Sequence, residues 1–400
     1  MLFTFGFYSS LLLISFSHGI VYSLLLLKKG IQTEVSSNYW LSIFIFVCCL
    51  YIAPWMLGFG GWYDNQPYRD ILFYTPFQHL FLIGPLMYFY IQSLLNPSFS
   101  LNIKNSIHFV PGFLYLLYSL SLFVYDKLIL GDYYFYQDGS DKDFDEWYQT
   151  AGQLSMLFYF IISIRFYNKY RELMQQVVSY ADSLLFKWIK TFLYSFLIML
   201  ILPVVFDALG LYFTELNSYK GSWWFFLFFS LVLYYIAIEG YANAVVAKIP
   251  FEISVFEKKP ALLLANPFHS ETEVLDIDFE FLENKPSEEI TFWKDKIESI
   301  IIHQKLYQDP ELSLTEVAKK LQTNASIISK AINQGFQMNF NDYINHHRVE
   351  SVKKAFTNGE HKTTTLLGIA YDCGFNSKAT FNRAFKKNTG LSPKEYIAKL

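Results

Sequence analysis

Seven long apolar stretches occupy the first 245 residues of this 400-residue chain. A helix needs roughly twenty apolar residues to cross a hydrocarbon core of about 30 Å. Hydrophobic residues make up 53% of the chain and charged residues only 17%, below the share of about 25% that is usual in soluble proteins. We therefore predict a bundle of seven transmembrane helices in a lipid bilayer, at about residues 2–27, 40–60, 71–95, 107–125, 151–168, 185–212 and 223–243.

The basic residues between these stretches predict how the bundle is oriented. The first stretch differs from a secretory signal peptide, because no Lys or Arg precedes Lys28. The loops assigned to the inner side carry eight basic residues: Lys28, Lys29, Lys104, Arg165, Lys169, Arg171, Lys187 and Lys190. The loops assigned to the outer side carry four: Arg69, Lys127, Lys142 and Lys220. By the positive-inside rule, the N-terminus lies outside and the C-terminal part lies in the cytoplasm.

Four ionisable residues lie in or near the predicted spans: His18, His79, Asp207 and Glu239. Such groups are costly within a membrane and often functional, so they are candidates for an intramembrane signal site. Alternatively, the acids reach the membrane surface from span ends and the histidines form hydrogen bonds between helices. The membrane half has no nucleophile elbow, metalloprotease motif, phosphate-binding loop or catalytic carboxylate pair, so we expect no enzymatic activity.

The three cysteines predict neither a disulfide framework nor a zinc site. Cys48 and Cys49 are adjacent in an apolar stretch, Cys373 stands alone, and no Cys/His spacing typical of zinc ligands occurs. We expect no metal and no cofactor.

Residues 246–286 have the composition of an acidic linker. Four prolines interrupt the periodicity, and residues 251–299 contain 12 Asp or Glu against 5 Lys or Arg. We expect an irregular tether; the alternative for residues 274–282 is a short strand or an amphipathic segment. A helix follows, with Ser287 as its N-cap and an apolar period from Ile290 to Ile301. This helix packs on the tail or mediates dimerisation, and the sequence does not choose between them.

The tail contains the same apolar stripe twice. Leu314, Val317, Ala318 and Leu321 form the first stripe, and Leu366, Ile369, Ala370 and Cys373 form the second. A short turn and another helix follow each stripe, with Asn324 and Ser377 as the N-caps. Two helix-turn-helix units are therefore predicted, joined by a long helix over 339–356. Residues 305–400 carry 14 Lys or Arg against 8 Asp or Glu, which suits a polyanion such as double-stranded DNA.

The second helix of each unit presents small polar and basic residues on the face opposite its apolar stripe. A helix of this kind can enter the major groove and contact base edges. In the first unit we place Ala325, Ser326, Ser329, Lys330 and Asn333 on the open face. In the second unit the open face holds Lys378, Ala379, Thr380, Asn382 and Arg383. All of these except Ala325 are our candidate DNA-binding residues.

The spacing of the second unit resembles the signature of AraC-type transcription regulators. The string Ile369-Ala370-Tyr371-Asp372-Cys373-Gly374-Phe375 is followed by Ser377, Thr380, Phe381, Arg383, Phe385, Lys386, Lys387, Gly390, Ser392, Pro393 and Tyr396 at the family's intervals. The resemblance covers about residues 300–398 and implies two helix-turn-helix units on one linking helix. It also implies that Ser326, Ser329 and Lys330 face bases, and that the open face of the second unit meets bases or phosphates.

The chain departs from the family at several positions. Ala331 and Ile332 stand where the family usually has Leu-Phe, and Val352 stands where Ala is usual. The membrane half resembles the multi-span input domains attached to some AraC-type regulators of Bacteroidetes-like bacteria, chiefly through residues 84–90.

Together these features predict an all-α protein with a seven-helix transmembrane bundle (1–245), a linker (246–286) and a double helix-turn-helix domain (287–400). The expected function is a transcription regulator in the cytoplasmic membrane of a bacterium, which responds to a small-molecule or envelope signal; a homodimer is left open. The first alternative is a transporter or membrane enzyme with a regulatory DNA-binding tail. The second is an interaction module whose tail binds a protein partner.

Overall fold

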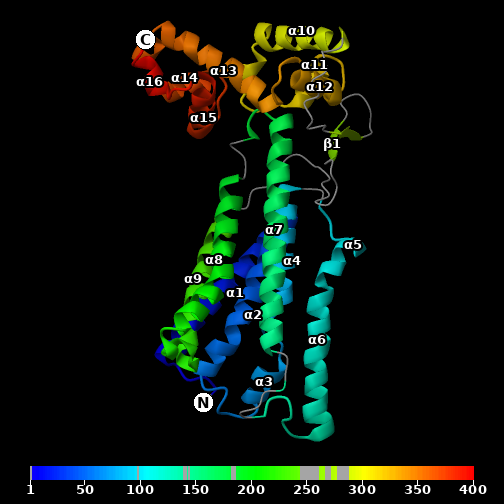
Figure 1. Cartoon of the computed structure of the whole chain (residues 1–400), viewed down its shortest axis with the longest axis vertical. Helices are drawn as coiled ribbons and strands as arrows, with labels where there is room; N and C mark the ends of the chain where they lie inside the picture. The colour runs from blue at the N-terminus through cyan, green and yellow to red at the C-terminus, as the bar shows by residue number, and fades with distance from the viewer. Residues whose placement is uncertain are drawn as a thin grey trace. The chain divides into compact units, whose positions relative to one another are not determined.

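A computed structural model describes residues 2–96, 99–137, 142, 145–181, 186–243, 261–265, 272–276 and 288–400. The chain divides into two compact units (Figure 1). The first unit comprises Met1–Arg165 and Lys187–Val246. The second comprises Phe166–Phe186 and Ala247–Leu400. Each unit is therefore built from two separate stretches of chain.

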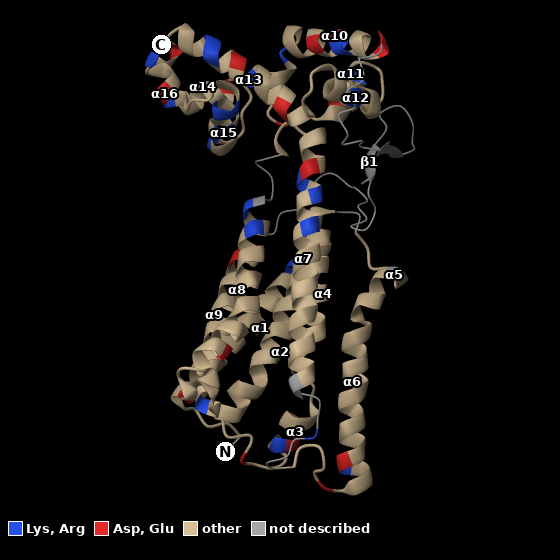
Figure 2. Cartoon of the chain, in the orientation of Figure 1, with Lys and Arg blue, Asp and Glu red and all other residues tan. Residues whose placement is uncertain are grey.

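The described part of the first unit is helical. Its elements are α1 (Phe7–Thr33), α2 (Ser36–Phe59), α3 (Tyr68–Tyr74), α4 (Leu80–Leu95), α5 (Ile103–Ser106), η1 (Ile107–Phe109), α6 (Val110–Phe123), η2 (Val124–Leu130), most of α7 (Asp145–Val177), α8 (Phe186–Gly210), η4 (Thr214–Asn217) and α9 (Tyr219–Ala242). Figure 2 shows that Lys, Arg, Asp and Glu are sparse along these helices and denser on the elements of the second unit. This contrast follows the apolar composition from which the spans were predicted.

Each of the seven predicted spans coincides with helix, the third being divided between α3 and α4. Among the described residues, five helices are long and apolar enough to cross a membrane: α1, α2, α8, α9 and the continuous run Ile107–Leu130. Helix α4 is also apolar but shorter. The predicted helical class is thus confirmed, whereas the number of seven spans remains a prediction.

Glycines allow close packing between helices of the first unit. A Cβ added to Gly19 on α1 would collide with the Cys49 side chain on α2. A Cβ added to Gly84 on α4 would lie 2.7 Å from Cδ2 of Tyr159 on α7. Small residues at such crossings let helix backbones approach closely, which is how helices associate where the surroundings are as apolar as the side chains.

The described part of the second unit contains one short hairpin and the helices of the tail. Strand β1 (Ala261–Ala265) pairs antiparallel with β2 (Thr272–Asp276), with Ala261 opposite Asp276. The helices are α10 (Glu288–His303), η5 (Leu306–Gln308), α11 (Leu314–Lys320), α12 (Ala325–Gly335), α13 (Phe340–Thr357), η6 (Glu360–Lys362), α14 (Leu366–Asp372), α15 (Lys378–Thr389) and α16 (Pro393–Ile397). The hairpin lies in the predicted linker, and Ser287 lies outside the described residues.

Helix α10 packs on the first helix-turn-helix unit. It buries Ile290, Ile297 and Ile301. Its Lys294 Nζ lies 5.0 Å from the ring centre of Phe336, at the end of α12. Of the two roles open for this helix, the structure shows packing on the tail.

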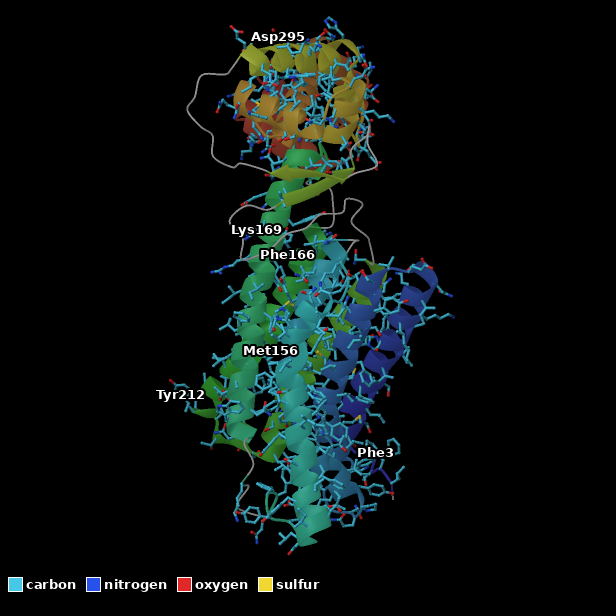
Figure 3. The ribbon with its side chains drawn as sticks, turned by 90° about the vertical axis from the view of Figure 1, so that its right-hand side faces the viewer. Phe3, Met156, Phe166, Lys169, Tyr212 and Asp295 are labelled. Carbon is cyan, nitrogen blue, oxygen red and sulfur yellow. The ribbon has the colours of Figure 1, made fainter. Side chains whose placement is uncertain are left out.

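Helix α7 passes from one unit into the other. It begins at Asp145 in the first unit, and its residues from Phe166 onward belong to the second. Figure 3 labels Phe166 and Lys169 at this passage. The sequence predicted a membrane span over 151–168 and placed Arg165, Lys169 and Arg171 on the inner side. Basic residues are equally compatible with helix outside a membrane, and the helix continues to Val177.

Candidate nucleic-acid interface

The first helix-turn-helix unit comprises α11 and α12. Ser313 and Glu316 cap α11 reciprocally: the Ser313 backbone N–H donates to Glu316 Oε2 at 2.7 Å, and the Glu316 N–H donates to Ser313 Oγ at 3.4 Å. Asn324 caps α12 by accepting the Ile327 N–H at 2.9 Å. The buried faces meet through residues with no exposed surface: Leu314, Val317, Ala318, Ile328 and Ile332. The predicted apolar stripe and the predicted cap at Asn324 are confirmed.

The open face of α12 is narrower than predicted. Lys330 is exposed, and Ser326 and Asn333 are half-buried. The predicted exposure was wrong for Ala325 and Ser329, which are 1% and 8% exposed. Ala325 is the first residue of α12 and is buried there. Ser329 Oγ accepts a hydrogen bond from Asn333 Nδ2 at 3.4 Å. Lys330 is therefore the most accessible of the candidate DNA contacts in this unit.

Helix α13 joins the two helix-turn-helix units. Its N-cap is Asn339, which accepts the Asp342 N–H at 2.8 Å. The helix spans Phe340–Thr357, within a residue of the predicted range. Its C-terminal half buries Val349, Val352 and Phe356 in the core of the second helix-turn-helix unit. The larger Val352, where the family usually has Ala, is accommodated there with no exposed surface.

The second helix-turn-helix unit comprises α14 and α15, with α16 closing its core. Thr365 caps α14, and Ser392 with Glu395 forms a capping box on α16. The turn between α14 and α15 contains Gly374 at a φ of +94°. The core consists of residues from α13, α14, the turn and α15, and Tyr396 and Ile397 of α16 pack against it: Val349, Val352, Ala355, Phe356, Ile369, Ala370, Cys373, Phe375, Phe381, Ala384 and Phe385. The predicted second unit is present with its stripe, turn and cap.

Helix α15 exposes four of its five candidate contacts: Lys378, Ala379, Asn382 and Arg383. The prediction that Thr380 is exposed was wrong, because its exposed fraction is 2%. Ser377 Oγ donates to Thr380 Oγ1 at 2.9 Å and accepts the Thr380 N–H at 3.1 Å, so this residue completes the cap. The pKa of Arg383 is lowered by desolvation and, second, by the nearby positive charge of Arg171. The reading helix thus presents basic and amide groups beside a further arginine.

Comparisons with known proteins match this part of the chain. Residues 307–399 match the family described as "Helix-turn-helix domain". An uncharacterized HTH-type transcriptional regulator of Staphylococcus aureus (strain COL) is 30% identical over 102 residues, which are 26% of this chain and 13% of that protein. A second, from Escherichia coli (strain K12), is 32% identical over 85 residues, which are 21% of this chain and 29% of that protein. Residues 307–399 form an AraC-type helix-turn-helix domain.

The similarity is limited to this AraC-type domain. The matched region spans less than a third of either relative, so the relatives give no information on the first compact unit with its apolar helices. No solved structure matches the chain.

A buried arginine lies at the centre of the AraC-type domain. Arg348 on α13 is 1% exposed, and all five of its N–H donors have acceptors. Nε donates to the Tyr307 carbonyl at 2.7 Å, and Nη2 donates to the Asp309 carbonyl at 2.6 Å. Nη1 donates to Asn345 Oδ1 at 3.2 Å. The remaining two donors bind Ser179, at its carbonyl (3.2 Å) and at Oγ (3.0 Å). Burial lowers the Arg348 pKa to about 10, which the charge of Asp309 partly opposes.

The sequence analysis did not single out Arg348, although a signal was present. Arg348 lies four residues after Ile344 and four before Val352, both of which have no exposed surface. A charged residue at this position of a buried helical stripe requires internal hydrogen-bond partners. Its partner Ser179 has no comparable signal, because it lies 169 residues away in the sequence.

His347 makes the stability of the AraC-type domain sensitive to acid. Burial and the charge of His346 lower its pKa from 6.5 to about 4, against an opposing effect of Glu350. Below pH 6.5 the unfolded chain binds a proton that the folded domain does not, so stability is lost as pH falls toward 4. We expect a loss of about 1–2 kcal/mol between pH 7 and pH 5.

Hydrogen exchange of α13 amides, corrected for the intrinsic effect of pH on exchange, measures this loss. His347→Gln should remove most of the pH dependence. The comparison variant is His346→Gln, whose ring is half-buried and bonded to Asn388 Oδ1 at 2.9 Å. It should keep most of the pH dependence, because burial lowers the His347 pKa more than the His346 charge does. An equal pH dependence in wild type and His347→Gln would contradict the prediction.

The four candidate intramembrane residues do not form one site. His18 stacks on Tyr234, with ring centres 3.7 Å apart, and its Nδ1 has no hydrogen-bond partner in the part of the chain that the structure describes. His79 is the N-cap residue of α4, and its buried Nδ1 has no hydrogen-bond partner among the described residues. Asp207 is exposed near the end of α8. Glu239 Oε2 accepts Asn243 Nδ2 at 2.9 Å near the end of α9. Their role in signalling remains a prediction.

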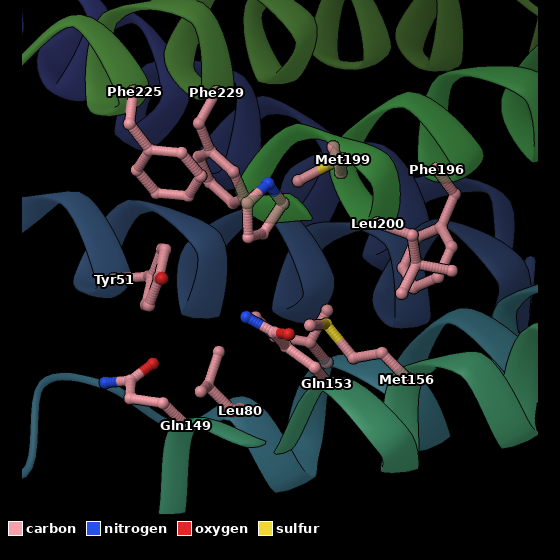
Figure 4. A pocket seen from close by; sticks show the side chains of 12 residues that line it. Tyr51, Leu80, Gln149, Gln153, Met156, Phe196, Met199, Leu200, Phe225 and Phe229 are labelled. Carbon is pink, nitrogen blue, oxygen red and sulfur yellow. The ribbon is translucent and has the colours of Figure 1, made fainter. Parts of the chain in front are cut away.

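A small cavity lies within the first unit, lined mainly by α2, α4, α7, α8 and α9 (Figure 4). Its volume is about 20 Å³, which is enough for one water molecule. Gln149 and Gln153 of α7 supply polar groups to its wall, together with Tyr51. Gln149 Nε2 donates to Gln78 Oε1 at 2.5 Å. None of the four candidate intramembrane residues lines this cavity. Among the described residues, no cluster of His, Cys, Asp or Glu could hold a metal ion.

Proposed function

We propose that this protein is a membrane-anchored transcription regulator. It binds double-stranded DNA through two helix-turn-helix units and responds to a signal received by its membrane helices. The observation that carries the proposal is the pair of capped units on one linking helix, with Lys378, Asn382 and Arg383 exposed on the second reading helix. Side chains of these types bind phosphates and base edges in the major groove.

The proposed location is the cytoplasmic membrane of a bacterium. Five long apolar helices support anchoring, and the excess of basic residues on the assigned inner loops supports a cytoplasmic AraC-type domain. The division into 1–245, 246–286 and 287–400 belongs to this proposal, with residues 166–181 joining the DNA-binding part. The signal is a small molecule or a change in the envelope, and it acts through a difference in affinity for two conformations.

Arg383→Ala should weaken DNA binding of the full chain by about tenfold to a hundredfold, because a good arginine contact in the groove contributes about 1–3 kcal/mol. Footprinting on genomic fragments, with the protein in lipid nanodiscs, identifies the bound sites. Titration at several salt concentrations then gives affinity and salt slope.

Lys394→Ala is the matched control, since it removes the same charge from α16, where Lys394 is exposed. It should change affinity by less than about threefold, as expected for a surface charge away from the groove. Absence of any sequence-selective footprint, or equal losses for the two variants, would sink the proposal. Binding without salt dependence would favour the interaction-module alternative. Substrate uptake that depends on His79, Asp207 or Glu239 would favour a transporter.

A further inference from the structure

The end of α7 and the residues after it are bonded to the AraC-type domain. Val178 and Ser313 form an antiparallel bridge, and the Ser179 N–H donates to the Leu312 carbonyl at 3.1 Å. Asn341 Nδ2 donates to the Val178 carbonyl at 3.2 Å. Arg348 binds Ser179 through two further hydrogen bonds. We call residues 170–181 the docked segment.

Burial of the docked segment is close to complete at its tip. Val177 is 1% exposed, and Val178, Ser179 and Ala181 have no exposed surface. Without Ser179, two of the five donors of Arg348 would lack their present acceptors. The surface around Arg348 is therefore a built binding site, and its occupant is the end of a helix that starts in the first unit.

The docked segment lies on the side of the domain that carries the reading helices. In Figure 1 the end of α7 enters between α15 and α12, and the side view of Figure 3 places it beneath the same domain. The positive charge of Arg171 acts on Arg383, an exposed base of α15. Strand β2 lies beside α12, where the candidate DNA contact Ser329 is less accessible than the sequence indicated.

This placement conflicts sterically with DNA. The major groove is about 12 Å wide and admits a single α-helix. An α-helix with its side chains is about 10–12 Å across, so a groove that holds α15 has no room for a second helix beside it. The conflict is not relieved by a side-chain rotation, because α7 is a continuous helix of 33 residues.

We propose that the docked segment is an internal inhibitor, which occupies the DNA-reading side of the AraC-type domain and competes with DNA for it. This inference rests on the proposed function and adds the means of its regulation. DNA binds after the docked segment leaves Arg348, Asn341 and Ser313. A signal that moves α7 therefore changes DNA affinity directly, because α7 begins in the first compact unit and its end belongs to the second.

The test is a reversible disulfide bond, called the lock below, that holds the docked segment on the AraC-type domain in the full chain. Val178 and Ser313 are a non-hydrogen-bonded antiparallel pair, so cysteines at these positions come within reach of a disulfide. The variant carries Val178→Cys and Ser313→Cys. It is reconstituted in nanodiscs, and its affinity for a fluorescent random-sequence 30-base-pair duplex is measured by anisotropy at low salt, before and after reduction. We expect the oxidised form to bind at least tenfold more weakly than the reduced form. Wild type treated with the same oxidant controls for Cys48, Cys49 and Cys373, which are buried.

A second variant opens the contact. Val178→Asp places a charge at a fully buried position, so we expect the docked segment to detach and DNA affinity to rise at least threefold. The control Asn168→Asp adds the same charge at an exposed position of α7, ten residues earlier, and should not raise affinity.

Each result decides between the proposals. Equal or tighter binding by the oxidised lock would overturn the inhibitor and leave DNA binding in place. Unchanged affinity in Val178→Asp would do the same, and if that variant fails to fold, the lock alone decides. If DNA is bound by neither the wild type, nor the reduced lock, nor a folded Val178→Asp variant, the proposed function is overturned, and the inhibitor with it.

Discussion

Gly374→Ala is expected to destabilise the AraC-type domain by about 3–5 kcal/mol, one of the largest effects of any single substitution in the chain. Gly374 adopts a φ of +94°, where L residues are strained. A Cβ at this position would also collide with the Tyr307 carbonyl and lie 2.8 Å from Cα of Gln308. Because both neighbours are backbone atoms, the clash is relieved only by separating the second turn from the segment that precedes α11.

Gly390→Ala is the matched control for this prediction. Gly390 ends α15 at a φ of +75°, and a Cβ there would meet nothing within 4 Å. Its substitution should cost only the conformational strain, about 1–2 kcal/mol. Hydrogen exchange of α14 and α15 amides in the full chain measures both losses. Equal losses for the two glycines would show that the contact with Tyr307 and Gln308 contributes nothing.

Arg348→Met is expected to cost about 3–5 kcal/mol, because five hydrogen bonds disappear while their acceptors stay buried. Methionine retains much of the side-chain volume, so the loss reports hydrogen bonding more than cavity formation. Cys373 is buried in the core of the second helix-turn-helix unit. Its labelling rate by a thiol reagent therefore reports how often the domain opens.

Lys353→Met is the comparison variant on the same helix. Lys353 Nζ lies 2.7 Å from Glu350 Oε1 in a partly exposed pair, so its loss should cost less than about 1 kcal/mol. Combining Arg348→Met with Ser179→Ala in a double-mutant cycle measures the coupling across the docked segment. Similar labelling rates for Arg348→Met and Lys353→Met would refute the assigned role of the buried guanidinium.

Local patterns in the sequence predicted most of the AraC-type domain. The stripes at Leu314 and Leu366, the caps at Asn324 and Ser377 and the linking helix all involve residues within a few turns of one another. Such features follow from helical periodicity and backbone capping, which single sequences express well. The same patterns were less successful at the ends of reading helices, where the first turns bury Ala325 and Thr380.

The contacts of the docked segment could not be predicted from the sequence. Val178 and Ser179 lack a helical or strand period of their own, and their partners come from distant parts of the chain. The basic residues of α7 predicted a loop, because charge reports exclusion from the membrane and does not report where a helix ends. In the first unit, apolar length located the helices, whereas assignment of the signal site requires knowledge of which side chains meet.

The bond between Ser179 and Arg348 also has a consequence for biosynthesis. The two residues are 169 positions apart in the sequence, so at about 5–20 residues per second the ribosome adds Arg348 roughly 8–34 s after Ser179. During that interval α8 and α9 are made, while the apolar tip at Val177 and Val178 lacks the surface that will bury it. Completion of the DNA-binding fold therefore waits for the last part of the chain, and a ribosome that stalls before α13 leaves this tip exposed to chaperones and proteases.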